Sequence, residues 1–277
     1  MTDLKIGFIG VGNQGAPIAR RIVDAGYDLT LWARRPESLE PYADTSARIA
    51  ATVAELGAAC DVVAICVRTD SDVADVCAEL LPVMHAGSVV LIHSTVHPEL
   101  CRRIAADAAL RSVTVLDAPV SGGPQRASEG QLGVMVGGNR EAYERLKPLI
   151  ATFSAHMDWL GEVGSGQICK LINNAQLTVN FATSLSFLNA GENLGLDRAA
   201  LGRMMQASSG QSYALAHMVK ATAQSMGFGR PLLEKDVGLV LDVLGAAGLG
   251  QSRAAEFSRT GIETYAALAD EMAGKES

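Results

Sequence analysis

The first half of the chain alternates short apolar runs with longer, alanine-rich stretches. Runs of Val, Ile and Leu predict strands at Lys5–Ile9, Leu29–Trp32, Val62–Val67, Ser88–Ile92 and Val113–Leu116. Amphipathic stretches between them predict helices at Ala16–Ala25, Arg48–Leu56, Asp70–Leu81 and Glu99–Leu110. Near-continuous apolar strands that alternate with helices are typical of a parallel sheet with both faces covered.

The second half loses this alternation. The last strand-like runs, Gly133–Val136 and His156–Leu160, flank a predicted helix at Arg140–Phe153. Beyond Gly164 only helices are predicted, at Ser165–Asn193, Arg198–Ala207 (with Asp197 as its N-cap), Ser212–Ser225, Leu232–Ala247 and Ser252–Leu268. We therefore predict a doubly wound, mostly parallel α/β domain over residues 1–163. An all-α domain follows over residues 164–277, and the long helix joins the two.

Composition narrows the classes of partner. The 277 residues are 48% hydrophobic and 19% charged, with a formal net charge of −7, so neither nucleic acid nor a membrane is an expected partner. The five cysteines have no metal-ligand spacing, and we expect them to be reduced core residues. The N-terminus has no signal-peptide pattern, and no apolar run reaches membrane-spanning length. These features predict a cytoplasmic protein without a metal.

A glycine-rich loop, GVGNQG, joins the first strand to the first helix. Gly10 permits the tight turn, Gly12 lets the backbone approach a pyrophosphate, and Gly15 lets helix and strand pack closely. The helix N-terminus adds free N–H groups for the phosphates. In this βαβ context the loop predicts a Rossmann dinucleotide-binding domain. The expected cofactor-binding residues of the loop are Gly10, Val11, Gly12, Asn13, Gln14 and Gly15.

The second strand indicates which dinucleotide binds. An acid at its end would hold the ribose hydroxyl of NAD, whereas arginine suits the 2′-phosphate of NADP. The sequence LTLWARR delivers Arg34 and Arg35 and no acid. We therefore predict NADP as the cofactor, with NAD as second choice. Val67, at the end of the third predicted strand, completes this side of the expected site.

A second glycine-rich segment, DAPVSGGPQRASEGQL, follows the fifth strand. Backbone N–H groups around Ser121, Gly122 and Gly123 would suit an anion such as a substrate carboxylate. The carboxyl end of a parallel strand is also where open α/β sheets bind ligands. A long surface turn explains the same composition equally well, so the segment alone leaves both readings open.

The helix beginning GQICKLINNA carries a lysine inside an apolar run. Lys170 and Asn174 are four residues apart and share one helix face, with Asn173 beside them. A buried lysine has a pKa below its reference of about 10.4, so Lys170 would suit proton exchange with a carbonyl or alcohol. The alternative is a snorkelling lysine whose head reaches water, which the segment alone slightly favours.

Taken together, five motifs in order make the chain similar to the β-hydroxyacid dehydrogenase family. They are GVGNQG at 10–15, STV at 94–96, DAPVSGG at 117–123, GSGQICKLINN at 164–174 and FGRPLLEKDVGLVLD at 228–242. The resemblance covers nearly the whole chain. It implies an oxidoreductase that moves hydride between a nicotinamide cofactor and a small β-hydroxyacid or semialdehyde bearing a carboxylate.

The resemblance also assigns roles to single residues. It implies that Lys170 is the general acid and base and that Asn174 binds the substrate. Ser121, Gly122 and Gly123 would hold the carboxylate, and Phe228 would close the pocket. Thr95 and Lys235 would contact the cofactor, with Asp236 beside Lys235. It further implies a homodimer or homotetramer that assembles through the helical domain.

Four positions depart from the family pattern. His93 stands where relatives often carry a small polar residue, and Ala33 replaces a common Asn. The roles of Arg68 and Arg126 stay open, as does the identity of the substrate. Two other functions are also considered, an imine reductase of the same architecture and a non-catalytic dinucleotide sensor. The retained Lys170 argues against both.

Overall fold

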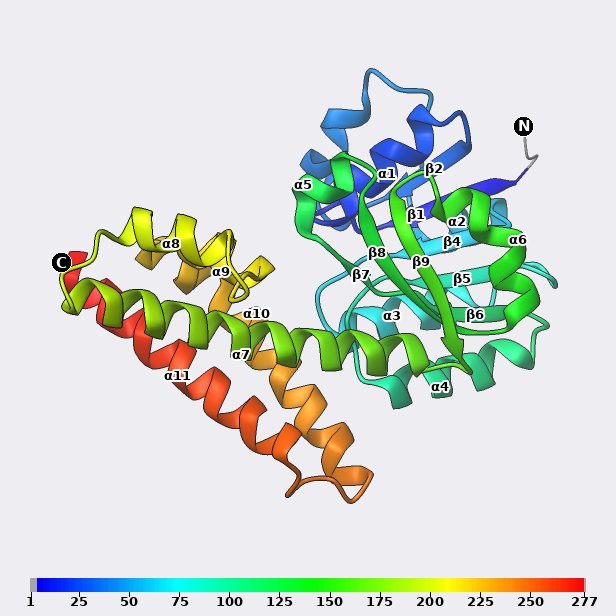
Figure 1. Cartoon of the computed structure of the whole chain (residues 1–277). Coiled ribbons are helices and arrows are strands. Elements are labelled where there is room, and N and C mark those ends of the chain that lie inside the picture. The colour runs from blue at the N-terminus through cyan, green and yellow to red at the C-terminus, as the bar shows by residue number, and fades with distance from the viewer. Residues whose placement is uncertain (1–3, 277) are drawn as a thin grey trace. The chain divides into compact units, whose positions relative to one another are not determined.

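The computed structural model describes residues 4–276. The chain divides into two compact units, and the division falls after Lys170. It therefore lies inside α7 (Ser165–Asn193), the 29-residue helix that the sequence predicted with the same limits (Figure 1). The predicted domain limits, 1–163 and 164–277, place the division at the start of this helix.

The first unit is built on one sheet, as predicted. Its strands are β1 (Lys5–Ile9), β2 (Asp28–Trp32), β3 (Arg48–Ile49), β4 (Val62–Ile65), β5 (Val89–Ile92), β6 (Thr114–Asp117), β7 (Val120–Ser121), β8 (Leu132–Gly138) and β9 (Ser154–Gly161). They lie in the order β3-β2-β1-β4-β5-β6-β8-β7, and β9 pairs with β8. The pairings from β3 to β6 are parallel, whereas β8 runs antiparallel to β6 and β7.

Helices cover both faces of this sheet. They are α1 (Gly15–Asp24), the 3₁₀ helix η1 (Pro36–Tyr42), α2 (Val53–Ala59), α3 (Asp70–Leu80), α4 (Pro98–Ala109), α5 (Gly123–Ser128) and α6 (Arg140–Ile150). Neighbouring residues of β1 enter different apolar clusters. Phe8 packs with Ile18 of α1 in one cluster, and Ile9 packs with Leu80 of α3 in the other. This division confirms the doubly wound α/β fold.

One prediction for the first unit was wrong in detail. The helix expected over Arg48–Leu56 begins only at Val53, because Arg48 and Ile49 extend the sheet as β3 beside β2. Thr52 then caps α2 by accepting the backbone N–H of Glu55 at 3.0 Å. The second glycine segment, for which the sequence left an anion site and a long surface turn open, contains β7 and α5. The helix over Arg48–Leu56 was predicted from local propensity, which contains no information on the pairing of β3 with β2.

The described part of the second unit is helical throughout, as predicted. It contains most of α7, then α8 (Arg198–Gln206), α9 (Tyr213–Met218), α10 (Ala223–Ala246) and α11 (Arg253–Glu276). Asp197 caps α8 as predicted, accepting the N–H of Ala200 at 2.7 Å. Fully buried Leu185 and Leu188 of α7 pack with Tyr265 of α11 in the core of this unit.

The middle helices of this unit differ from the prediction. The helix expected over Ser212–Ser225 ends at Met218, and α10 begins at Ala223 instead of Leu232. A capping box at Thr222 starts α10, where Thr222 and Ser225 exchange side-chain and backbone bonds. The helix continues through Pro231, after which the prediction had placed its start. Between residues 4 and 276 no helix is long and apolar enough to span a membrane.

Candidate active site

The glycine loop has the geometry that a dinucleotide requires. Gly10 adopts φ +96°, and a Cβ there would lie 2.3 Å from the Cys66 carbonyl oxygen. A Cβ on Gly15 would lie 2.0 Å from the Gly10 carbonyl oxygen, so only glycine lets α1 pack this closely. A Cβ on Gly12 would meet nothing within 4 Å, so the backbone there is open to an approaching group. Gly10 and Gly15 thus permit the tight turn and the close packing predicted for them, while the pyrophosphate role of Gly12 stays a prediction.

The loop also presents an unpaired donor. In the part of the chain that the structure describes, the side-chain nitrogen of Gln14 is buried and has no hydrogen-bond partner. Gln14 is the N-cap residue of α1, and no acidic residue lies in the first turn of that helix. An orphaned donor at a helix N-terminus suits an acceptor such as a pyrophosphate or ribose oxygen. These features fit a nicotinamide dinucleotide.

A pocket lies beside the loop within the first unit. Its lining comes from the glycine loop, the end of β2 and the segments after β2 and β4, namely Gly10, Val11, Gly12, Trp32, Ala33, Arg34, Arg35, Ser38, Val67, Arg68, Asp72 and Val76. Arg34 and Arg35 are therefore in the pocket, as is Val67. The guanidinium of Arg34 donates through Nη2 to Oδ1 of Asp72 at 2.5 Å. Sequence reasoning missed Asp72, because it comes from α3 and not from β2.

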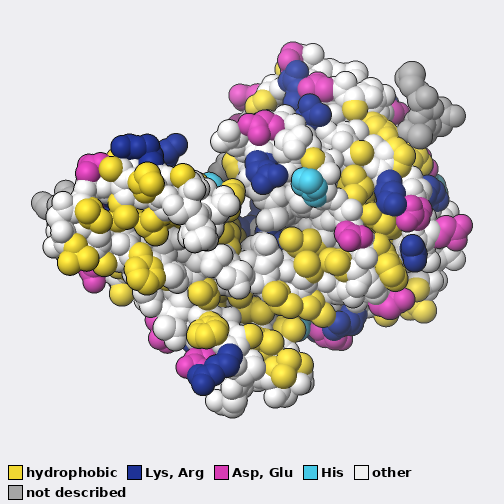
Figure 2. All heavy atoms as spheres, in the orientation of Figure 1, with side chains coloured by type: hydrophobic (Ala, Val, Ile, Leu, Met, Phe, Trp, Pro, Cys, Tyr) yellow, Lys and Arg dark blue, Asp and Glu magenta, His cyan; other side chains and the backbone are white. Residues whose placement is uncertain are grey.

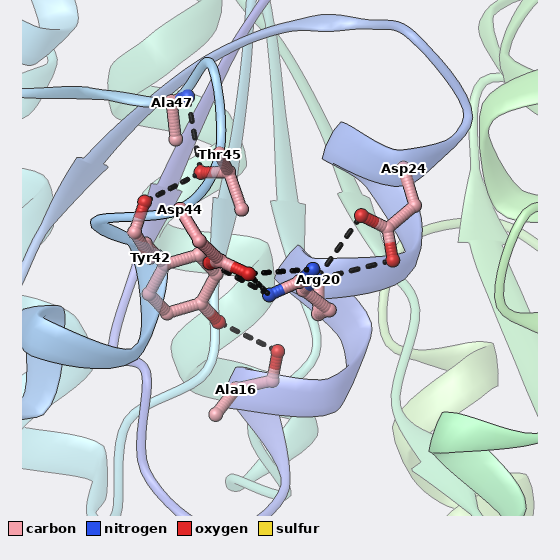
Figure 3. A network of polar contacts seen from close by, with 7 residues as sticks. All are labelled: Ala16, Arg20, Asp24, Tyr42, Asp44, Thr45 and Ala47. Carbon is pink, nitrogen blue, oxygen red and sulfur yellow. Dashed lines mark hydrogen bonds and ion pairs between the residues drawn. The ribbon is translucent and has the colours of Figure 1, made fainter.

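A polar network holds the segment that follows Arg35 against α1 (Figure 3). Arg20 donates to Asp24 on its own helix and to Asp44, with closest distances of 3.0 Å. Tyr42 donates its hydroxyl to the Ala16 carbonyl oxygen at 2.6 Å, and burial raises the pKa of this phenol. The network fixes one wall of the pocket, where Ser38 lies on the intervening η1.

The ends of β4 and β5 are tied to the start of α7. Ser94 Oγ accepts the backbone N–H of Val67 at 2.8 Å. The fully buried Gln167 donates Nε2 to the Ser94 carbonyl oxygen at 2.8 Å and accepts the N–H of Val96 at 3.1 Å. Gln167 thus holds the backbone on both sides of Thr95, the residue expected to lie along the cofactor.

Asp117 fixes the N-terminus of α7. This fully buried residue ends β6, and its carboxylate accepts the N–H of Gly164 at 2.7 Å and that of Gln167 at 2.8 Å. Burial raises the pKa of the Asp117 carboxyl, and the backbone donors oppose that shift. A Cβ on Gly166 would lie 2.3 Å from the Met135 carbonyl oxygen, so the helix start also requires glycine. The GSGQ motif therefore fixes the start of α7 to the end of β6.

Lys170 and Asn174 lie one turn apart on α7, and each is 8% exposed. Both residues are therefore buried, and the role of Lys170 as general acid and base stays a prediction. Asn174 donates Nδ2 to Oδ2 of Asp236 at 2.5 Å, and its own Oδ1 accepts from Asn173 at 3.0 Å. Asp236 is 1% exposed, and its Oδ1 lies 3.1 Å from Lys235 Nζ. Asn174 is thereby oriented within the second unit.

The remaining predicted residues lie on separate elements. Ser121 ends β7, and Gly122 and Gly123 have φ +135° and +74° at the start of α5. A Cβ on Gly123 would meet nothing within 4 Å, so its backbone is open. Phe228 lies on α10 and is 79% exposed. Its closing role, like the carboxylate role of the other three, stays a prediction.

His93, the departure before Ser94, is a buried neutral histidine. Its Nδ1 lies 2.7 Å from the Ala118 carbonyl oxygen, so this nitrogen carries the proton and donates. Its ring lies between those of Phe8 and Phe153, with centroids 6.3 and 5.5 Å away. Desolvation lowers the pKa of His93 to about 4. The side chain joins the end of β5 to the segment that leads to Ser121.

We expect His93 to make the stability of the first unit sensitive to acid. Its folded-state pKa of about 4 lies below the ordinary 6.5, so between these values the unfolded chain binds a proton that the folded chain does not. The stabilisation is complete above pH 6.5 and falls by about 3 kcal/mol as pH drops to 4. Chemical denaturation of the wild type and His93→Asn across this range checks it. Equal slopes of unfolding free energy against pH would contradict the prediction.

Comparison with known proteins identifies both units. Residues 5–161 match the model of the NAD binding domain of 6-phosphogluconate dehydrogenase. Residues 164–275 match the model described as NAD-binding of NADP-dependent 3-hydroxyisobutyrate dehydrogenase. An uncharacterized oxidoreductase of Mycobacterium tuberculosis is 36% identical over 242 residues, which cover 85% of this chain and 82% of the relative.

Solved structures agree with these matches. The structure of Mycobacterium tuberculosis 3-hydroxyisobutyrate dehydrogenase with L-serine has a TM-score of 0.85 and 26% identity, covering 98% of this chain and 95% of that one. The structure of Psf3 in complex with NADP+ and 2-OPP has a TM-score of 0.82 and 25% identity, covering 95% and 93%. The fold, the glycine loop and these relatives together show that the chain is an oxidoreductase of the β-hydroxyacid dehydrogenase family.

Proposed function

We propose that this protein is an NADP-dependent oxidoreductase acting on a small β-hydroxyacid or on the matching semialdehyde. The observation that carries the proposal is the buried Lys170 on α7. In the first turn of this helix, Gln167 donates its backbone N–H to Asp117 and its side-chain amide to the Ser94 carbonyl oxygen. These bonds fix the start of the helix to the unit that holds the dinucleotide loop. A lysine held in this way suits proton exchange at a fixed position.

The cofactor proposal rests on charge in the pocket. Arg34 and Arg35 line it, and arginine binds phosphate through several N–H donors at once. The related Psf3 structure contains NADP+, which supports the same choice. When bound, the nicotinamide would supply or accept the hydride. The glycine loop and the N-terminus of α1 would hold its pyrophosphate, with Thr95 along its ribose.

Lys170 would exchange the proton, and Asn174 would bind the substrate. Lys170 would give a proton to the carbonyl oxygen during reduction and take it back from the hydroxyl during oxidation. Asn174 has one amide N–H bonded to Asp236 and its oxygen bonded to Asn173, which leaves the other N–H for the substrate. Because both partners fix the amide, that N–H has a defined direction.

A carboxylate on the substrate would bind at Ser121, Gly122 and Gly123. The Ser121 hydroxyl and the open backbone at Gly123 supply donors without a bulky side chain. The related dehydrogenase of Mycobacterium tuberculosis was solved with L-serine, itself a small hydroxy compound bearing a carboxylate. Phe228 would cover the apolar part of such a substrate.

We also propose a homodimer or homotetramer that works in the cytosol. Large apolar side chains of the helical unit are more than half exposed, among them Phe187, Leu232 and Phe257. Hydrophobic side chains are visible over these helices on the face drawn in Figure 2. Exposed apolar area of this kind is typical of an oligomer interface. All five cysteines are free thiols, which suits a reducing compartment.

A substrate panel tests the proposal. The purified chain is assayed with hydroxyacids of three to five carbons, their semialdehydes and a cyclic imine, each with NADPH or NADH or the oxidised form. We expect turnover of at least one carboxylate-bearing pair, with higher kcat/KM for the phosphorylated cofactor. NADPH binding without any turnover would favour a sensor, and turnover restricted to the imine would favour an imine reductase. Higher kcat/KM with NADH would refute the cofactor assignment.

A further inference from the structure

The pocket beside the glycine loop contains an acid as well as arginines. Among the described residues that line it, Asp72 is the one acidic side chain, and Arg34, Arg35 and Arg68 supply positive charge. A carboxylate in a site for a phosphorylated ribose needs an explanation, because it repels the phosphate. This inference builds on the proposed NADP preference and concerns its extent.

The sheet order explains how Asp72 reaches the pocket. Strand β1 lies between β2 and β4, and the glycine loop leaves the end of β1. Arg34 follows β2 on one side, and Asp72 lies in the first turn of α3, which follows β4 on the other side. The two side chains meet beside the loop. The acid that β2 lacks is therefore supplied by a different element.

Asp72 is held in place by its own helix. Its Oδ2 accepts the backbone N–H of Thr69 at 3.1 Å and the Thr69 hydroxyl at 2.8 Å, while its N–H donates to Thr69 Oγ1 at 3.1 Å. This capping box leaves Oδ1 to accept from Arg34 Nη2. The Asp72 side chain is 18% exposed, whereas that of Arg34 is 72% exposed. The anchored carboxylate therefore sets the position of the exposed guanidinium.

The Arg34–Asp72 pair would interact differently with NADP and with NAD. A 2′-phosphate would compete with Asp72 for the Arg34 guanidinium and would be repelled by the carboxylate. A free 2′-hydroxyl would not compete, and it could donate a hydrogen bond to that carboxylate. We propose that Asp72 is a cofactor-discriminating residue that limits the preference for NADP and retains affinity for NAD.

The test measures binding of NADP+ and NAD+ to the purified full chain without substrate, by titration calorimetry. Asp72→Asn keeps an oxygen acceptor for the Thr69 cap and removes the charge. We expect it to bind NADP+ roughly fivefold tighter, the size of one exposed ion pair, and NAD+ no tighter. The gain should shrink at high salt. Weaker NADP+ binding, or equal changes for both dinucleotides, would overturn the inference.

Two further variants make the result specific. Asp75→Asn removes the same charge from the same helix, and Asp75 has only a long-range attraction for Arg34. It should change the ratio of the two dissociation constants less than Asp72→Asn does. In an Arg34→Ala background, Asp72→Asn should lose most of its effect on NADP+. An equal effect of Asp75→Asn, or an undiminished effect without Arg34, would also overturn the inference.

Failure of this inference is separable from failure of the proposed function. The wild-type ratio of dissociation constants tests the NADP preference. The change in that ratio on Asp72→Asn tests the role of Asp72, whichever cofactor the wild type prefers. Thermal unfolding of each variant reports whether α3 keeps its cap, so a folding defect is recognised independently.

Discussion

Lys170→Ala is expected to lower kcat by about 10²–10⁴-fold while changing the dissociation constant of NADP+ little. That range is the usual contribution of a positioned general acid or base. The dinucleotide loop joins β1 to α1, so removing an amine on α7 should leave the loop intact. The measurement is steady-state kinetics with the best substrate of the panel, together with NADP+ titration of the same preparation.

Two variants separate proton transfer from charge. Lys170→Arg keeps the positive charge, but the pKa of a guanidinium is far higher than that of an ammonium group, so it gives up its proton poorly. We expect it to be nearly as inactive as Lys170→Ala. Lys220→Ala removes an exposed lysine of the helical unit and should retain activity. If Lys170→Ala kept most of the wild-type kcat, Lys170 would not be the proton donor.

Asp117→Ala is expected to destabilise the first unit by on the order of 4 kcal/mol. The change would leave the buried N–H groups of Gly164 and Gln167 without their acceptor and would open a cavity between β6 and α7. Urea unfolding followed by circular dichroism measures the loss. Asp107→Ala, on the exposed face of α4, should change stability by less than about 0.5 kcal/mol.

Asp117→Asn separates folding from positioning. Asn keeps one oxygen acceptor but turns an amide N–H towards the other donor, so the start of α7 should shift and Lys170 with it. In the fraction that folds, we expect kcat to fall while the affinity for NADP+ is retained, because small displacements of a catalytic group slow the reaction steeply. Wild-type kcat and stability in this variant would show that Asp117 does not position the helix.

Elements with a strong local signal were predicted well. Helix α7 has the predicted limits, because apolar residues recur along it and neither Gly nor Pro occurs from Gln167 to Ala190. Strand β1 and the cap at Asp197 are likewise local features. The prediction of a helix over Arg48–Leu56 was wrong because a two-residue strand is fixed by its neighbour. Helix α10 was misjudged at Pro231, since tertiary packing maintains the helix through it.

The residues of the candidate site also fall into two groups, those with a local sequence signal and those without one. Gly10, Gly12, Gly15 and Arg34 belong to a motif that can be read along the chain. Asp117 and Asp72 act on segments far away in sequence, and only the sheet order brings them there. A signal for Asp117 did exist, because a charged residue ending an apolar strand must find donors inside the protein. Nothing local to Asp72 distinguishes it from an ordinary capping residue.

The measurement that tests the central claim most directly follows a labelled hydride. The purified chain is mixed with NADPH deuterated at the transferable position and with a short semialdehyde bearing a carboxylate, and the product is examined by mass spectrometry and NMR. The account predicts one deuterium on the carbinol carbon of the β-hydroxyacid, and far less product from the methyl ester of the same semialdehyde. Absence of deuterium on that carbon across the panel, despite bound NADPH, would contradict it.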